Sequence, residues 1–284
     1  MTRRAVRRRL DLELVRRGLV PSRAHAHDVV ARGAVLVGGA VADKPARLVA
    51  ESDAIVVDTG GRRFVSRGGD KLEAALERFP VAVGGRRCLD AGASTGGFTD
   101  CLLQRGAAAV TAVDVGYGQL HPRLRHDRRV VVRERTNIRN LGTGDDGDGD
   151  GDSGGGGFGL VVADLSFISL AVVVPVLLTH ASPGADLVVL VKPQFEVGHA
   201  DVSRGRGVVR DQALRRAALD RVASALQDAG ATIMGAMASP VLGPAGNAEY
   251  LLWARTPVPG ERAPVGADVA AALDAAVAAS PDRG

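Results

Sequence analysis

Four charged residues lie where a folded chain could bring them together. Lys71 lies in the string SRGGDKL, Asp164 in ADLSFISL, Lys192 in LVKPQFE and Glu249 in GNAEYLLW. The last three lie at or beside the ends of predicted strands, and ligand crevices in parallel sheets lie outside the carboxyl ends of the strands. Two ammonium and two carboxylate groups at one edge can transfer a proton or stabilise a developing charge. A single lysine after a strand is usually a solvated surface group, so this hypothesis depends on their convergence.

A glycine-rich turn in the string LDAGASTGGFTDCLL lies between a predicted strand and a predicted helix. Gly92, Gly96 and Gly97 allow the backbone to approach a ligand closely, and the start of the helix offers free N–H groups. Because dinucleotides also bind such turns, the glycines alone do not identify the ligand.

Two acidic residues narrow the choice of ligand. Asp90 precedes the turn, where its carboxylate can accept a hydrogen bond from an ammonium group. Asp114 ends the next predicted strand, where it can bind ribose hydroxyls. A carboxylate before the turn would repel the pyrophosphate of NAD, but it fits the amino-acid end of S-adenosylmethionine. Either residue alone would be read as a capping or turn carboxylate, whereas the two together favour the methyl donor.

The elements that must position these residues alternate along the chain. We predict strands at 87–90, 109–114, 130–134, 160–163, 187–191, 232–238 and 249–254, with helices at 71–78, 98–105, 170–180 and 211–228. Apolar strands that alternate with helices predict a parallel sheet covered on both faces. The expected fold is therefore α/β, with a seven-stranded Rossmann-like sheet that suits a methyltransferase.

The N-terminal segment has a different composition. Residues 1–35 hold nine arginines against Asp11, Glu13 and Asp28, although the net charge of the whole chain is only +4. Guanidinium groups bind phosphate with paired donors and keep their charge near neutral pH. The alternative is a solvated helix face, which is the commoner fate of a charge run. The pattern between 10 and 58 is two short helices followed by short strands, which is too small for an enzyme core.

The string RLDLELVRRGLVPSRAHAHDVVARGAVLVGGAVADKP resembles the S4 RNA-binding domain, in which two helices present basic residues to structured RNA. The match rests on Arg9, Leu10, Asp11, Leu14, Val15, Gly18, Leu19, Ser22, Arg23, Gly33, Val35, Val37, Lys44 and Pro45. The family often has an asparagine-glycine pair where this chain has Gly39, a small departure that concerns the turn. The resemblance implies RNA contacts by Arg4, Arg7, Arg8, Arg9, Arg16, Arg17, Arg23 and Lys44.

We expect these domain boundaries: an S4-like domain at 1–58, a linker at 59–66, a catalytic domain at 67–256 and a flexible tail at 257–284 with a possible short helix over 267–279. Residues 140–159 interrupt the catalytic domain with glycines and aspartates. Such a stretch cannot bury enough apolar surface to offset its ordering entropy, so we predict a disordered insertion. Alternating Asp and Gly also fits a calcium loop, but a terminal glutamate at the required spacing is missing.

The strings SRGGDKL, DAGASTGGFTD, DVGYGQL, ERTNIR, DLSFISL, LVKPQFE and GNAEYLLW resemble those of 2'-O-methyltransferases related to FtsJ/RrmJ, which carry a Lys-Asp-Lys-Glu tetrad. An S4 domain joined to such a catalytic domain resembles the TlyA family, once called haemolysins. The resemblance covers about residues 3–256. It implies methylation of cytidine 2'-hydroxyls in ribosomal RNA or ribosomal subunits with S-adenosylmethionine as donor, and no metal.

The family pattern also implies roles for individual residues. It places Asp90, Gly92 and the turn from Ser94 through Thr95 and Gly96 to Gly97 around the donor, Asp114 at its ribose, and the ERTNIR segment with Asn137 beside the adenine. Lys192 is the candidate base for the hydroxyl. It could instead act as a cation that stabilises the developing oxyanion, and the sequence leaves both roles open.

Other functions remain as alternatives: an RNA methyltransferase for a base or a uridine ribose, a ribosome-assembly binding module with a vestigial donor pocket, or a membrane-lysing toxin. The tetrad disfavours the second. The apolar runs are shorter than the roughly 18 residues that a spanning helix needs, and a strongly amphipathic basic helix is missing, which disfavours the third. The N-terminus lacks a secretory pattern, and Cys88 and Cys101 lack partners at metal spacing. We therefore expect a cytoplasmic, monomeric protein with reduced thiols.

Overall fold

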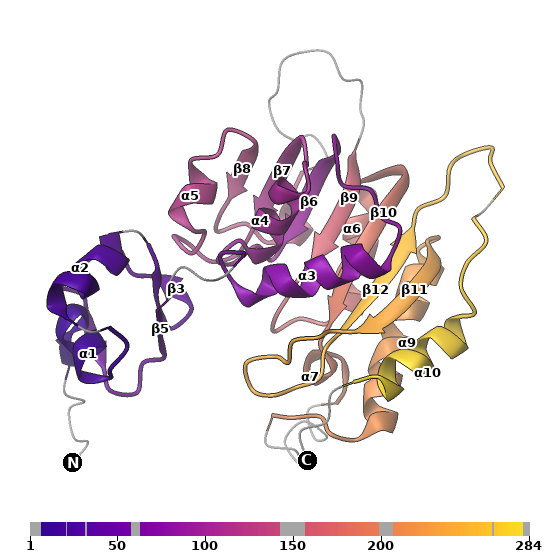
Figure 1. Ribbon diagram of the computed structural model, residues 1–284. Helices are drawn as coiled ribbons and strands as arrows, with labels where there is room; N and C mark the ends of the chain where they lie inside the picture. Colours follow the sequence, from indigo (N-terminus) through magenta and orange to yellow (C-terminus); the bar gives the residue numbers. More distant parts are fainter. Residues whose placement is uncertain are drawn as a thin grey trace.

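The computed structural model describes residues 7–20, 22–31, 33–57, 63–142, 157–198, 207–262 and 264–280. These residues form a small N-terminal region and a larger α/β region (Figure 1). Each region has a hydrophobic core of its own. The described residues of the two regions therefore pack around separate cores.

The N-terminal region packs two helices on short antiparallel strands. Its elements are β1 (Arg7–Arg9), α1 (Leu10–Arg16), α2 (Arg23–Ala31), β2 (Val35–Val37), β3 (Ala40–Val41), β4 (Leu48–Ala50) and β5 (Ile55–Val57). Strand β2 pairs with β3 and β5, and β1 pairs with β4. Leu10 and Leu14 of α1 are fully buried beside Val29 and Val30 of α2. The helical spacing of these residues in the sequence therefore marks the core face.

The α/β region is built on a seven-stranded sheet in the order β11-β12-β10-β9-β6-β7-β8. The strands are β6 (Arg87–Ala91), β7 (Ala109–Val113), β8 (Val130–Arg133), β9 (Phe158–Ala163), β10 (Ala181–Val191), β11 (Thr232–Ala238) and β12 (Tyr250–Arg255). Strand β12 is antiparallel to both of its neighbours, while the pairs among β10, β9, β6, β7 and β8 are parallel. The predicted seven-stranded α/β sheet is confirmed.

Helices cover both faces of this sheet. They are α3 (Arg67–Arg78), α4 (Gly97–Gln104), α5 (Pro122–Arg125), α6 (Leu170–Thr179), α7 (Pro193–Glu196), α9 (Gln212–Asp228) and α10 (Val269–Ala278), with a 3-10 turn at Ile138–Asn140. Residues of α6, α9 and α10 belong to one buried cluster, and residues of α3, α4 and α5 belong to the other. Strand residues such as Leu187–Val191 are buried without alternation because both faces are covered.

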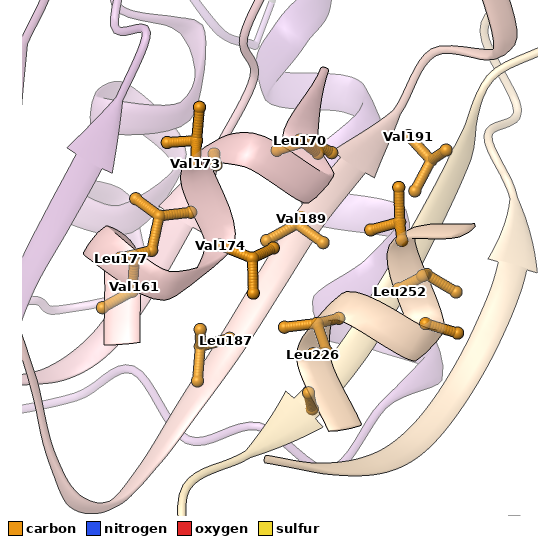
Figure 2. Close-up of a cluster of buried hydrophobic side chains, with 14 of the residues drawn as sticks. Val161, Leu170, Val173, Val174, Leu177, Leu187, Val189, Val191, Leu226 and Leu252 are labelled. Atoms are coloured by element: carbon orange, nitrogen blue, oxygen red, sulfur yellow. The ribbon is translucent and has the colours of Figure 1, made fainter. Parts of the chain in front are cut away.

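Figure 2 shows the first of these clusters, with Val174 and Leu177 of α6 close to Val161 of β9 and Leu187 of β10. Leu177 has no exposed surface. Full burial of a leucine side chain stabilises a fold by roughly 1.5–3 kcal/mol relative to exposure. Helix α6 is thereby fixed against the two strands whose ends carry Asp164 and Lys192.

The C-terminal tail differs from the sequence expectation. The predicted short helix forms as α10, but it is packed rather than flexible, because Leu273, Ala276 and Val277 are buried in the core cluster. The predicted linker at 59–66 also ends in structure, since Phe64 and Val65 are buried. Most of the predicted disordered insertion lies outside the described residues, and Phe158 near its end already belongs to β9.

Candidate active site

The sheet brings three of the four charged residues to one edge. Asp164 follows β9 and Lys192 follows β10, and these two strands are parallel neighbours. Glu249 directly precedes β12, whose first residue Tyr250 pairs with Val191 at the end of β10. Because β12 runs antiparallel to β10, its start lies at the carboxyl edge of the parallel strands. Glu249 therefore lies at the same edge of the sheet as Asp164 and Lys192.

The fourth charged residue comes from α3, and the four residues form two ion pairs. Lys71 Nζ lies 2.5 Å from Glu249 Oε2, and Lys192 Nζ lies 2.6 Å from Asp164 Oδ1. The Lys71 and Glu249 side chains are only 8% and 1% exposed, so their charges attract each other with little solvent screening. All four line one cavity of about 640 Å³. The structure therefore brings the predicted tetrad together.

A second cavity of about 490 Å³ adjoins the first. Gly92, Ser94, Asp164, Ser166 and Phe167 line both cavities. The second cavity is otherwise lined from β7 onward by Val113, Asp114, Val115, Gln119, Thr136, Asn137, Ile138, Arg139, Leu165 and Ile168. The two cavities thus meet at the glycine turn and at Asp164.

The backbone at Gly92 explains why this position needs glycine. Its φ is +85°, and a Cβ atom would lie 2.6 Å from the carbonyl oxygen of Asp164. Any side chain there would push the turn away from the loop that carries Asp164. At Gly97, a Cβ atom would lie 2.3 Å from Ser66 Oγ, so α4 can approach the start of α3 only without one. The glycines therefore keep the turn close to both charged loops.

Asp90 supports the turn from beneath. It is fully buried, accepts a hydrogen bond from Thr99 Oγ1 at 2.6 Å, and lines neither cavity. Burial, together with the negative charges of Asp164 and Asp114, raises the pKa of Asp90 to about 7, although the bond from Thr99 opposes this. Its Oδ1 atom has no hydrogen-bond partner among the described residues. One buried carboxylate oxygen behind the glycine turn is thus left without a hydrogen-bond donor among the described residues.

Asp114 and Asn137 line the second cavity. Asp114 accepts hydrogen bonds from the backbone N–H groups of Ser94 at 2.8 Å and Gly116 at 2.6 Å. These bonds hold the carboxylate between the glycine turn after β6 and the end of β7. Asn137 accepts from Arg139 N at 3.1 Å and begins the 3-10 turn. Thr95 is buried at the wall of the first cavity.

The predicted RNA-binding arginines have different surroundings. Arg9 and Arg23 bond to the buried Asp11, and Arg16 bonds to the buried Glu13. Arg17 bonds to Glu13 and to the carbonyl oxygens of Ala50, Glu51 and Asp53. Arg17 thus has a structural role, because its donors are satisfied inside the domain. Arg7, Arg8 and Lys44 are exposed, and Arg4 lies outside the described residues.

Sequence reasoning missed several residues of the cavities. Ser166 Oγ accepts a hydrogen bond from Lys192 Nζ at 2.8 Å. Phe167 is 91% exposed with a φ of +65°, and its ring lies 5.3 Å from that of Phe195. Ser166, Phe167 and Phe195 lie within three positions of a tetrad residue in DLSFISL and KPQFE. Their closeness to a strand end was the signal that could have found them. Leu36 and Gly39 of the N-terminal region also line the first cavity.

Comparisons with known proteins fit this architecture. The FtsJ-like methyltransferase family matches residues 64–256, and the S4 domain matches residues 8–55. A TlyA protein of Mycobacterium tuberculosis, named 16S/23S rRNA (cytidine-2'-O)-methyltransferase, is 54% identical over 90% of this chain and 91% of its own length. The chain belongs to the TlyA family of FtsJ-like methyltransferases.

Two other TlyA-type relatives carry a different name. Hemolysin A of Brachyspira hyodysenteriae is 39% identical over 86% of this chain and 98% of its own length. A solved structure of a candidate hemolysin from Streptococcus thermophilus is 35% identical, with a TM-score of 0.70 over 97% of this chain and 96% of that one. Among the residues that the structure describes, none of the helices has the length and apolar character to span a bilayer.

Proposed function

We propose that this chain transfers a methyl group from S-adenosylmethionine to the 2'-hydroxyl of a cytidine in ribosomal RNA. The observation that carries the proposal is the pair of lysine–carboxylate contacts in one cavity, joined to a second cavity at Gly92 and Asp164. A reaction between two bound molecules needs two compartments that open onto each other. The named activity of the relative from M. tuberculosis supports the choice of substrate.

The residues of the second cavity suit the methyl donor. Asp114 supplies a carboxylate for the ribose hydroxyls, and Asn137 and Ile138 provide a polar and an apolar contact for the adenine. We assign the ammonium group to Asp90 Oδ1, which has no hydrogen-bond partner among the described residues. Because Asp90 lies behind the glycine turn and lines neither cavity, the turn must shift to admit this contact. When bound, the donor supplies an electrophilic methyl group on a sulfonium. These residues hold it in place.

The tetrad prepares the sugar oxygen. A ribose 2'-hydroxyl is a weak nucleophile, so it must be placed in line with the methyl carbon and lose its proton. Lys192 Nζ is fixed by Asp164 and Ser166 at the junction of the two cavities. As an ion-paired ammonium it stabilises the developing oxyanion, and as a neutral amine it takes the proton. Lys71 and Glu249 line the same cavity as the second ion pair.

The N-terminal region supplies the RNA-binding surface in this proposal. Exposed arginines on β1 and the arginines held by Asp11 and Glu13 present guanidinium groups to phosphates. Leu36 and Gly39 border the first cavity, so RNA bound to this region can reach the tetrad. We expect the protein to act in the cytoplasm, on ribosomal RNA or ribosomal subunits, as a monomer and without a metal.

The test is methyl transfer from labelled donor to purified ribosomal subunits and to naked ribosomal RNA. The labelled RNA is hydrolysed with alkali, because a 2'-O-methylated nucleotide resists cleavage at its linkage. We expect the label in alkali-resistant dinucleotides whose 5' nucleoside is 2'-O-methylcytidine. Label in single nucleotides would indicate a methylated base and contradict the proposal, and label on the ribose of a uridine would contradict the assigned nucleoside.

A further inference from the structure

Two separate loops carry Asp164 and Lys192, and the proposed reaction requires a fixed distance between these two side chains. The first loop follows β9 and holds Asp164 and Ser166. The second is the turn that begins at Lys192 and continues into α7. Near the cavity the two loops meet through the contacts of Lys192 Nζ with Asp164 and Ser166. Both contacts depend on one long, rotatable side chain, so they cannot by themselves fix the backbones.

A second connection between the loops lies away from the cavities. Glu196, the last residue of α7, is 3% exposed. Its carboxylate accepts a hydrogen bond from Ser169 Oγ at 2.6 Å and another from the backbone N–H of Leu170 at 2.7 Å. Ser169 is the N-cap residue of α6, yet its side chain makes no cap bond of its own. Glu196 therefore caps α6 from a distant part of the sequence.

The turn between Lys192 and Glu196 is short and constrained. Pro193, the first residue of α7, restricts its own backbone φ angle. Two backbone hydrogen bonds close the turn: Phe195 N donates to Lys192 O at 2.9 Å, and Val197 N donates to Pro193 O at 3.0 Å. Arg221 of α9 also donates to the Glu196 carbonyl oxygen at 3.1 Å. A turn held in this way moves as a unit. A shift of Glu196 is therefore transmitted to Lys192 instead of being absorbed.

The cost of burying Glu196 is consistent with a specific role. Burial raises the pKa of this carboxyl above its usual range, while the bonds from Ser169 and Leu170 oppose the rise. The positive charge of Arg221 also opposes the rise in the pKa of Glu196. Burying such a carboxyl is still more expensive for a fold than burying an apolar residue. Glu196 lines neither cavity, so it does not touch the reacting groups.

We propose that Glu196 is a positioning residue for methyl transfer: by tying α7 to the start of α6, it sets the separation between Lys192 and Asp164. The inference rests on the proposed function. It assigns no chemical step to Glu196, which acts through Lys192. A small displacement of a catalytic group can cost about 100-fold in rate, so the loss of this tie should reduce turnover more than binding.

The test compares Glu196→Ala, Glu196→Asp and Glu196→Gln in the full chain. The aspartate keeps the charge but is too short to reach both donors. The glutamine keeps the length, because its amide oxygen can accept from Leu170 N and its amide nitrogen can donate to Ser169 Oγ. We expect the alanine and aspartate variants to lose about 10- to 100-fold in kcat and glutamine to retain most of it, with donor and RNA Kd nearly unchanged.

The matched control is Asp268→Ala, which removes the N-cap of another helix, α10. Asp268 accepts from Ala271 N at 3.1 Å, and it lines neither cavity. This variant should lower the Tm and leave kcat unchanged. The inference is overturned if kcat of Glu196→Ala stays at the wild-type value, or if the aspartate variant is as active as glutamine. If the alanine variant does not fold, the aspartate–glutamine comparison decides.

The same assay separates this inference from the proposed function. A wild-type protein that transfers no methyl group to RNA would refute the proposed function and, with it, this inference. An active wild type together with fully active Glu196 variants would refute only the inference. An active wild type with a selective loss of kcat in the alanine and aspartate variants would support both.

Discussion

Two fully buried aspartates, one in each region, have opposite surroundings. Asp11 of the N-terminal region is contacted by Arg9, Arg23 and His27. These contacts, above all the bonds from Arg9, hold the pKa of Asp11 well below its usual range. Asp90 of the α/β region has a bond from Thr99 but no ion pair among the described residues, and its pKa is raised to about 7.

The difference shows which of the two carboxylates finds a positively charged partner among the described residues. The charge of Asp11 is balanced by arginines whose outer surfaces remain available to a partner, so the same contacts stabilise the domain and orient its basic side chains. Asp90 lacks a positive partner, which is expensive in a core unless a bound molecule provides one. The charge of Asp11 is thus balanced within the chain, whereas that of Asp90 is not balanced by an ion pair among the described residues.

The largest expected effect is on Lys192. If the α/β region is arranged for reaction, Lys192→Ala should lower methyl transfer by about 10²–10⁴-fold, which is the usual contribution of a positioned proton-transfer group. The Kd of the donor should change little. Calorimetry of donor binding and single-turnover kinetics measure the two quantities.

Lys192→Arg sharpens this result. Arginine keeps the positive charge but does not lose its proton in proteins. Partial activity would support stabilisation of the oxyanion, whereas a loss as complete as that of alanine would support a base. Full activity of the alanine variant would contradict the assignment of the tetrad.

The second effect concerns how Asp90 makes the free energy of unfolding depend on pH. Its raised pKa means that the folded state holds a proton that the unfolded state releases, so stability is greatest below about pH 4 and is lost as pH rises through about 7. Relative to Asp90→Asn, the wild type should lose roughly 1.4 kcal/mol of unfolding free energy for each pKa unit of the shift. Urea unfolding of both proteins from pH 4 to 8 measures the difference.

The donor should reverse this trend. A bound ammonium favours the ionised carboxylate, so the wild type should bind the donor more tightly as pH rises through about 7, and Asp90→Asn should show a flatter profile. Thr99→Val serves as a control that removes the hydrogen bond from Thr99 Oγ1 and leaves the carboxylate. Identical pH profiles for wild type and Asp90→Asn would break the comparison between the two aspartates.

The third effect concerns Asp11, with the opposite sign. Its lowered pKa contributes stability that is present above about pH 4 and is lost as pH falls below that value. Asp11→Asn should lower the stability of the N-terminal region by about 2 kcal/mol at neutral pH, since it removes charge-assisted hydrogen bonds. Hydrogen exchange of the α1 and α2 amides measures this in the full chain. Unchanged protection would contradict the role of Asp11.

The smallest effect separates two arginines. Arg8 is exposed and has only a 3.9 Å contact to Glu13, whereas Arg17 bonds to three backbone carbonyls. Arg8→Ala should reduce the slope of log K against log salt for RNA binding by about 0.7–0.9 per lost phosphate contact. Arg17→Ala should chiefly lower the Tm. Equal salt slopes for Arg8→Ala and wild type would remove Arg8 from the RNA surface.

The sequence by itself determined the order of the elements and the charged residues at strand ends. Apolar runs such as Leu187–Val191 predicted buried strands, and the spacing of Leu10 and Leu14 predicted a helix, because these patterns depend only on which faces are covered. The tetrad positions followed from the same logic combined with recognised motifs. Short elements such as α5 and α7 were missed, since four residues give no periodicity.

Only the tertiary structure decided which charges are paired with each other. Lys71 and Glu249 are 178 positions apart in the chain, and their contact depends on α3 packing beside the antiparallel strand β12. The flexible tail was a wrong expectation because its alanine-rich pattern does not reveal that Leu273 meets the sheet. Likewise, Arg17 and Arg8 look alike in sequence. Hydrogen-bond partners supplied by distant segments make one structural and leave the other at the surface.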